Sequence, residues 1–353
     1  MLYLLNDYQE GAHPEVLRKL IETNFEPMPG YGFDKYTASA AEKIRAACEC
    51  PEAQIKFLNG GTMTNVVVID SMLKSYEGVI AAASGHINSH EAGAVEATGH
   101  KVLVVGHDYG KTPPFEPSED DGKLDAAAID RYISDFYADA TYEHMVFPGM
   151  VYVTHPTEYG TLYTREELSA ISEVCRKWDI PLYLDGARLA YGLASREADL
   201  TLPDIARLCD IFYIGGTKCG ALCGEALVFT RNNMPEHFLT LIKSHLALNA
   251  KGRLIGVQFD ALFTDDLYSR IGKRAIDTGM RVREIMASKG YISFIDSPTN
   301  QQLFIVENSK LDALSEKIAY DCMMKYDDDH TVIRFCTSWA TDMDAVETLN
   351  EIL

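Results

Sequence analysis

One lysine of the chain follows an apolar segment and is surrounded by glycines. Lys218 lies in IGGTKCGALCG (214–224), at the end of the apolar run DIFYIG (210–215), whose β-branched and aromatic residues predict a buried strand. The glycines allow another group to approach the backbone closely, and Thr217 adds a hydroxyl. A lysine that is desolvated in such a place is a nucleophile suited to Schiff-base formation. A surface lysine on a glycine turn has the same local pattern, so the interpretation depends on residues elsewhere.

An aspartate and an arginine follow a second predicted strand. PLYLD (181–185) places Asp185 at the carboxyl end of a strand, where open α/β sheets bind ligands, and Arg188 comes three residues later. A carboxylate there can pair with a protonated pyridine nitrogen and make the aromatic ring an electron sink. An aspartate N-cap with an arginine on the following turn is the alternative for this segment alone.

A glycine turn links the predicted strand QIKFL to the helical segment VVVIDSMLKSY. In this turn, NGGTMTN (59–65), the amides of Gly61, Thr62 and Met63 are expected to point out of a helix N-terminus. Free N–H groups and the helix dipole stabilise a phosphate at such a place. The chain has a formal net charge of −20, so an anionic ligand needs a local positive field of this kind.

Two histidines also follow predicted strands. His86 comes just after GVIAAA, where an imidazole can stack on a flat ring, and His155 comes just after MVYVT. His90 and Glu91 are expected to support the site from outside it or to lie on a helix surface. A lone histidine is more often structural, so neither His86 nor His155 indicates chemistry without the other residues.

Strands and helices alternate along the first two thirds of the chain. Thr164 and Glu167 form a capping box at the start of a helix whose apolar residues share one face. Strands that are apolar on both faces and separated by helices predict an α/β fold with a mostly parallel central sheet and helices on both faces. The stretch 106–123, rich in Gly, Pro and acids, is expected to be a surface loop. The predicted strands are 54–58, 78–83, 101–105, 150–154, 181–185 and 210–215.

The pattern changes near residue 245. A long helical tract runs to Met286, followed by the strands ISFID, QLFIV and VIRFCTSW and by helices around 310–325 and 344–353. We therefore expect a large α/β domain over residues 21–245 and a smaller α+β domain with an antiparallel sheet over residues 246–353.

Composition excludes several classes of protein. The acidic surface argues against nucleic acid or a membrane as partner, and no apolar run is long enough to cross a bilayer. The N-terminus lacks the features of a signal peptide, and the eight scattered cysteines predict reduced thiols in a cytoplasmic protein. No metal site is expected from the pairs Cys48 and Cys50 or Cys219 and Cys223, nor from the acidic run 327–329.

The order of these motifs resembles the threonine aldolase branch of the β-eliminating lyases, which are fold-type-I pyridoxal-phosphate enzymes. The resemblance rests on NGGTMTN, GHINSHEAGA, LDGAR, GGTK and IRFCTSW, and it extends from LLNDYQEGAHPEVL almost to the C-terminus. It implies the fold-type-I architecture, an N-terminal segment (1–20) near the active site, and a homodimer or homotetramer with sites at the subunit interface. Two segments differ from the usual pattern: THPTEYG replaces a THN-like sequence, and GGTKCG replaces an SKGLGAP-like one.

The resemblance also implies a role for each matching residue. Lys218 would form the Schiff base with pyridoxal 5′-phosphate, Asp185 would pair with the pyridine nitrogen, and His86 would stack on the ring. The phosphate would be held by Gly61, Thr62 and Thr217.

The substrate side of the site is implied in the same way. Arg188 and Arg334 would bind the substrate carboxylate, a task suited to a bidentate guanidinium. Asn6 and Asp7 belong to the N-terminal segment that returns to the site. Lys251 and Arg253 are weaker candidates, for contact with the phosphate of a neighbouring subunit or for a structural ion pair.

The implied reaction is cleavage of a β-hydroxy-α-amino acid, L-threonine or L-allo-threonine, to glycine and an aldehyde. The base that takes the hydroxyl proton could be His86, His155 or a water between them. The alternatives are another pyridoxal-phosphate-dependent β-eliminating lyase or an aminotransferase acting on a small amino acid, or a catalytically silent binding protein. A nicotinamide-dependent enzyme is disfavoured because no G-x-G-x-x-G follows a predicted strand.

Overall fold

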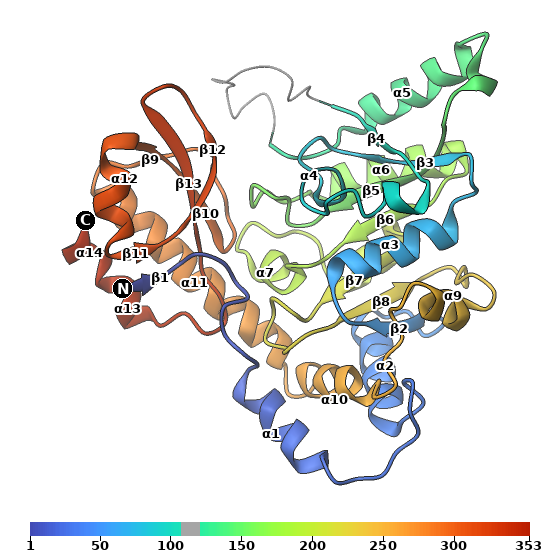
Figure 1. Cartoon of the computed structure of the whole chain (residues 1–353), viewed down its shortest axis with the longest axis horizontal. Coiled ribbons are helices and arrows are strands. Elements are labelled where there is room, and N and C mark those ends of the chain that lie inside the picture. The colour runs from blue at the N-terminus through green and yellow to red at the C-terminus, as the bar shows by residue number, and fades with distance from the viewer. Residues whose placement is uncertain (107–120) are drawn as a thin grey trace.

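A seven-stranded sheet forms the centre of the computed structural model, which describes residues 1–106 and 121–353 (Figure 1). Its strand order is β2-β8-β7-β6-β5-β3-β4. All neighbouring strands are parallel except β8, which runs antiparallel to β2 and β7. The strands are β2 (Gln54–Leu58), β3 (Glu77–Ala81), β4 (Val102–Val104), β5 (Phe147–Thr154), β6 (Leu182–Asp185), β7 (Ile211–Gly215) and β8 (Glu225–Phe229).

The mostly parallel sheet predicted from the sequence is thus confirmed, with one strand added. All six predicted strands occur, whereas β8 was missed. The run EALVF that forms β8 lies only seven residues after Lys218, and a turn that short permits only an antiparallel return. Most of the predicted loop 106–123 lies outside the described residues.

Helices cover both faces of this sheet. One face packs against α3 (Gly61–Met72) and α9 (Phe238–Ser244), through side chains such as Val67 and Phe238. The opposite face packs against a larger set of helices. These are α2 (Lys35–Ala47), α5 (Ala126–Ala138), α6 (Arg165–Trp178), α8 (Leu202–Leu208) and α10 (Arg253–Leu262). The capping box at the start of α6 forms as predicted.

The C-terminal part contains a four-stranded antiparallel sheet of order β12-β13-β10-β9 beside the long helix α11 (Leu267–Ser288) (Figure 1). The strands are β9 (Ile292–Ser293), β10 (Gln301–Glu307), β12 (Asp321–Lys325) and β13 (His330–Cys336). The helices of this part are α12 (Asn308–Ser315), α13 (Met343–Glu347) and α14 (Leu349–Ile352).

The helix predicted around residues 310–325 is wrong in its second half. Helix α12 ends at Ser315, and the chain then forms the short strand β11 (Ile318–Ala319) and the edge strand β12. Strand β11 pairs with β1 (Leu2–Tyr3), and β12 pairs with β13. Strand β1 lies at the other end of the chain, and β13, which follows β12 after a short turn, also pairs with β10, so tertiary pairing overrides the local helical pattern.

The N-terminal segment connects the two parts of the molecule. It starts in β1 beside the C-terminal sheet and continues to α1 (Pro14–Thr23), which lies near α10 (Figure 1). On the way, the amide of His13 donates to the carbonyl of Gly220, two residues after Lys218. Helix α10 packs against α1 and α2, so the chain beyond residue 246 begins in contact with the larger part. The domain boundary at 245/246 stays a prediction.

Candidate active site

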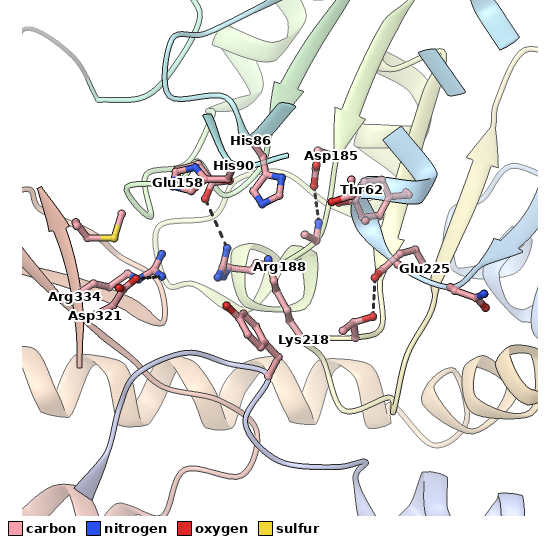
Figure 2. A pocket seen from close by; sticks show the side chains of 18 residues that line it. Thr62, His86, His90, Glu158, Asp185, Arg188, Lys218, Glu225, Asp321 and Arg334 are labelled. Atoms are coloured by element: carbon pink, nitrogen blue, oxygen red, sulfur yellow. Dashed lines mark hydrogen bonds and ion pairs between the residues drawn. The ribbon is translucent and has the colours of Figure 1, made fainter. Parts of the chain in front are cut away.

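A cavity of about 450 Å³ opens at the carboxyl ends of the parallel strands (Figure 2). Its walls come from the N-terminus of α3, the short helix α4 (His86–Ser89), the turns after β5, β6 and β7, the N-terminal segment and the strands β12 and β13. This size suits a small cofactor together with a small substrate.

Lys218 and Asp185, which lie 33 residues apart in the sequence, both line this cavity (Figure 2). The turns that carry them pack directly on each other. The amide of Gly215 donates to the carbonyl of Gly186, and a Cβ at Gly215 would lie 2.1 Å from the carbonyl oxygen of Ala187. Glycine is required at this contact because any side chain would push the two turns apart.

The carboxylate of Asp185 is buried and held in one orientation. Its Oδ2 accepts from the hydroxyl of Tyr152 at 2.5 Å and from Nδ2 of Asn65 at 3.2 Å, and its Oδ1 accepts from the amide of Ala187 at 3.0 Å. An acid with fixed donors on both oxygens keeps its position when a ligand enters. It therefore offers a preorganised negative charge to a cationic ring.

His86 reaches into the cavity from the start of α4 (Figure 2). Its Nδ1 lies 2.7 Å from the buried carboxylate of Glu91, and its ring stacks near that of His90. Burial disfavours the imidazolium, but Glu91, Glu158 and Asp185 outweigh burial and raise the pKa of His86. The prediction that His90 and Glu91 lie outside the site is wrong for His90, which lines the cavity itself. Glu91 does not line the cavity and acts through its contact with His86.

The turn before α3 also lines the cavity, as the glycine pattern predicted. Gly60 is the N-cap, so the first amides of the helix, those of Gly61, Thr62 and Met63, precede the first intrahelical bond. A Cβ at Gly61 would lie 3.1 Å from the hydroxyl of Tyr213. Gly61 and Thr62 face the cavity, whereas the side chain of Met63 packs into the core.

Arg188 lies in the wall and is paired with the N-terminal segment. Its Nε and Nη2 donate to the carboxylate of Asp7 at 2.7 and 3.1 Å, while its Nη1 lies 4.0 Å from Glu158. Burial alone raises the pKa of Asp7, but the charges of Arg188 and Lys218 outweigh burial and lower it. One edge of the guanidinium is thus held by Asp7, and Nη1 is left for a ligand.

Arg334 enters from β13 on the other side of the cavity (Figure 2). Its Nη1 donates to Oε1 of Gln301 at 2.9 Å and its Nη2 to the carboxylate of Asp321 at 2.7 Å. Its Nε is buried and has no hydrogen-bond partner among the described residues. The two arginines predicted from the sequence therefore line one cavity.

Besides Met63 and Asp7, four predicted residues lie away from the cavity wall. His155 is buried behind it, where its Nδ1 accepts from the amide of Tyr163 and burial lowers its pKa to about 4. Asn6 caps the amide of Tyr8, and it is Tyr8 that lines the cavity. The remaining two are Lys251, which is exposed, and Arg253, which donates to the carbonyls of Thr23 and Glu26.

The sequence patterns indicated none of three acids of the cavity: Glu158, Glu225 and Asp321. Glu158 follows β5 in HPTEYG, and Glu225 is the first residue of the unpredicted strand β8. The segment THPTEYG, which departs from the family pattern, carries both His155, buried behind the cavity, and Glu158, which lines it. Nothing local distinguishes Glu225 from a surface acid, because its burial depends on its neighbours β2 and β7.

Replacing Asp7 by Ala tests the anchoring of the N-terminal segment. Because Arg188 would remain buried without its partner, the free energy of unfolding is expected to fall by about 3–5 kcal/mol. Asp7 has a lowered pKa in the folded protein, so its contribution is present above about 3.8 and is lost as the pH falls through the lower folded value. Urea unfolding at several pH values measures both effects. Replacing Asp130, which pairs with Lys177 at the surface, is the control and should change the free energy of unfolding little. An equal loss in both variants would contradict the anchoring role of Asp7.

The chain is similar to several known proteins. Residues 4–307 match the family model for beta-eliminating lyases. A low-specificity L-threonine aldolase from Pseudomonas aeruginosa is 28% identical over 352 residues, which cover 98% of this chain and 94% of the relative. A solved structure of threonine aldolase from Leishmania major is 38% identical with a TM-score of 0.91, covering 100% of this chain and 99% of that one.

More distant structures share the fold alone. An aspartate aminotransferase from Thermus thermophilus is 15% identical with a TM-score of 0.69, and it covers 100% of this chain and 90% of that one. Among the described residues, no helix is both long and apolar enough to cross a membrane. The match over most of the chain, together with the Leishmania structure, shows that this protein belongs to the beta-eliminating lyase family of pyridoxal-phosphate-dependent enzymes.

Proposed function

We propose that this enzyme cleaves β-hydroxy-α-amino acids such as L-threonine or L-allo-threonine to glycine and an aldehyde, with its cofactor held on Lys218. The observation that carries the proposal is that Lys218, Asp185, His86 and the free amides of α3 converge on one cavity. The Pseudomonas and Leishmania relatives, which are named threonine aldolases, support this choice of substrate.

The cavity residues fit pyridoxal phosphate. The amine of Lys218 suits its aldehyde carbon, Asp185 suits the pyridine nitrogen, and the α3 amides suit the phosphate. His86 and the small side chain of Ala187 offer surfaces for the ring. When bound, the cofactor supplies an electron sink for the electrons of the broken Cα–Cβ bond.

Arg188 and Arg334 are proposed to hold the substrate carboxylate. Both guanidiniums line the cavity, and each is fixed by an acid of its own, Asp7 or Asp321. Fixing the guanidinium beforehand reduces the entropy lost on binding. A carboxylate held between them is oriented relative to Lys218, which places the bond to be broken with respect to the ring.

The hydroxyl proton of the substrate needs a base within the cavity. His86 and Glu158 both line it, whereas His155 does not. Because Nδ1 of His86 is engaged by Glu91, Nε2 is the nitrogen left to accept a proton. We propose that His86 Nε2 takes this proton, with Glu158 and Arg188 placed beside it.

Replacing Glu91 by Gln tests the role of His86. The base must be neutral, so activity is expected to rise with pH as His86 loses its proton, and its raised pKa puts this rise above the usual value of 6.5. Glu91→Gln removes one cause of the raised pKa, so the acidic limb of kcat/KM should move to lower pH. The pH profile measures this shift. A limb that stays in place in Glu91→Gln but disappears in Glu158→Gln would assign the proton to Glu158 instead.

We also propose a homodimer or homotetramer with the site near a subunit interface. Phe33 and Leu246 are 65% and 88% exposed, and the turn that carries Phe33 is hydrogen-bonded to the segment that carries Leu246. Exposed apolar side chains on adjoining segments suit a protein interface. This segment reaches the cavity through hydrogen bonds between Asn249 and Asn59, which supports the proposal that the exposed Lys251 contacts a partner's phosphate site. Light scattering after gel filtration tests the assembly, and a purely monomeric enzyme would exclude it.

A reducing compartment such as the cytoplasm is proposed from the thiols. All eight cysteines are free, and five of them are buried. Free buried thiols are ordinary in reducing compartments, where disulfides are rare.

The reaction is tested by incubating the purified enzyme with pyridoxal phosphate and L-threonine or L-allo-threonine. Stoichiometric aldehyde and glycine are expected, and omission of either the cofactor or the amino acid should abolish both. Amino transfer to 2-oxoglutarate without aldehyde release would contradict the proposal and indicate an aminotransferase.

A further inference from the structure

Glu225 is a buried acid inside the proposed phosphate site. It is 3% exposed and lines the cavity, as do Gly61, Thr62 and Thr217. Its Cα is paired with Leu58 on β2 and with Gly215 on β7.

Those two pairings place Glu225 between both halves of the phosphate site. Strand β2 leads into the turn of Gly60 and Gly61, and β7 leads to Thr217. An ionised carboxylate there would repel a phosphate, so this acid needs an explanation that the proposed reaction does not supply.

The hydrogen bonds of Glu225 determine which way a neighbouring proton points. Its Oε2 accepts from the amide of Gly216 at 2.9 Å, and its Oε1 lies 2.7 Å from Oγ1 of Thr217. Oγ1 of Thr217 also accepts from the amide of Gly224 at 3.0 Å. An ionised Glu225 can only accept, so it takes the single hydroxyl proton of Thr217 and leaves that oxygen with lone pairs alone for a phosphate.

A neutral Glu225 reverses this bond. Its own O–H then donates to Oγ1 of Thr217, which accepts from both Glu225 and Gly224 and has its proton free for a phosphate oxygen. We propose, on the basis of the proposed function, that Glu225 is protonated when the cofactor phosphate binds and that Thr217 relays this hydrogen bond to the phosphate. Where Glu225 is ionised in the apoprotein, cofactor capture would then take up one proton, and Glu225 is a positioning residue of the phosphate site.

The surroundings of Glu225 favour its neutral form. Burial comes first among the causes that raise its pKa to about 7, and the carboxylate of Asp185 on β6 adds to it. The hydrogen bonds from the hydroxyl of Thr217 and the amide of Gly216 oppose this rise in pKa, as does the charge of Lys218. The other titratable groups that act with Glu225 are Tyr183 on β6, Tyr213 on β7, Cys219 and Cys223 in the turn, and Tyr268 on α11.

The protonation state of Glu225 predicts how the affinity for the phosphate changes with pH. A raised acid pKa means that the neutral form prevails below about 7 and is lost as the pH rises through that value. A bound phosphate raises the pKa further, since its charge opposes a second anion beside it. The phosphate's contribution to affinity should therefore decrease above neutral pH.

The experiment measures the affinity of the apoprotein for pyridoxal phosphate and for pyridoxal, which lacks the phosphate. The ratio of the two dissociation constants isolates the phosphate and cancels effects on Lys218. In the wild type, the ratio of the dissociation constant of pyridoxal to that of pyridoxal phosphate is expected to fall roughly 30-fold between about pH 6 and about pH 8.5. Glu225→Gln keeps a permanent N–H toward Thr217 and an oxygen toward Gly216. In this variant the ratio of the two dissociation constants should therefore stay high and nearly constant.

Calorimetry in two buffers of different ionisation enthalpy gives an independent readout. At about pH 8 the wild type should take up about one proton more with pyridoxal phosphate than with pyridoxal, and Glu225→Gln should take up none. Parallel pH profiles in the two proteins, or equal proton uptake, would overturn the inference.

A second pair of variants keeps the test decisive if Glu225→Gln does not fold. Thr217→Val removes the hydroxyl that relays the hydrogen bond, so the ratio of the two dissociation constants should be low at both pH values. Thr217→Ser keeps a hydroxyl and should retain the wild-type ratio. Equal ratios in wild type and Thr217→Val would overturn the relay. Failure of the proposed function is a separate outcome, because it is read from the absence of aldehyde release from L-threonine, which none of these binding measurements depends on.

Discussion

Lys218→Ala is expected to lose at least about 10⁴-fold in aldehyde release from L-threonine, since effective molarities of well-placed groups reach about 10⁵–10⁸ M. No other amine is expected to replace it, because Lys218 is the lysine that lines the described cavity. The visible absorption band of the wild type with cofactor should disappear on treatment with borohydride, and the variant should lack the covalent adduct in its mass spectrum.

The matched control is Lys273→Ala. Lys273 is exposed on α11 and pairs with Asp277, outside the cavity, so its removal should leave both the spectrum and turnover unchanged. Circular dichroism checks that both variants are folded. A Lys218→Ala enzyme that retains turnover within about tenfold of wild type would refute the assignment of the nucleophile.

Asp185→Asn is expected to lower kcat/KM by about 10²–10³-fold while leaving the cofactor bound. An amide has nearly the same shape as the carboxylate but has no charge to pair with a pyridinium, and breaking a buried ion pair costs about 3–5 kcal/mol. The Oδ1 contact with the amide of Ala187 can survive, because an amide oxygen still accepts. The cofactor's electron sink should therefore weaken more than its binding.

Steady-state kinetics and a cofactor titration separate these two effects. The natural comparison is Asp185→Glu. The glutamate keeps the charge but moves the carboxylate by one methylene relative to Tyr152 and Asn65, which donate to Asp185 in the wild type. Partial recovery in Asp185→Glu would support the charge as the cause. A loss confined to cofactor affinity, with unchanged kcat at saturation, would show that Asp185 only helps to bind the cofactor.

Much of the fold follows from local pattern. The six predicted runs of the central sheet occur where the sequence predicted them, and inner strands such as β6 and β7, which are buried on both faces, are the most apolar of them. Thr164 and Glu167 cap α6 as expected, since a capping box uses only groups within one turn. The lysine after β7 and the aspartate after β6 were found for the same reason: each directly follows a strong strand signal.

Other features depend on partners far away in the chain. Strand β11 lies in a segment predicted to be helical, because it is stabilised by pairing with β1 at the opposite end of the chain. His155 has the same local context as His86, yet only His86 lines the cavity, because α4 turns it inward while His155 is buried beneath Tyr163. No rule of spacing separates the two.

The sequence by itself determined the types and order of the chemical groups: a lysine, an aspartate, a glycine turn and two arginines, each at the end of a predicted strand or within a recognisable motif. Only the tertiary structure decided their electrostatic state. Asp7 pairs with Arg188 across 181 residues, and Glu225 becomes a buried acid between β2 and β7. Charge and protonation depend on burial and on neighbours brought together by folding, and neither is a property of the local sequence.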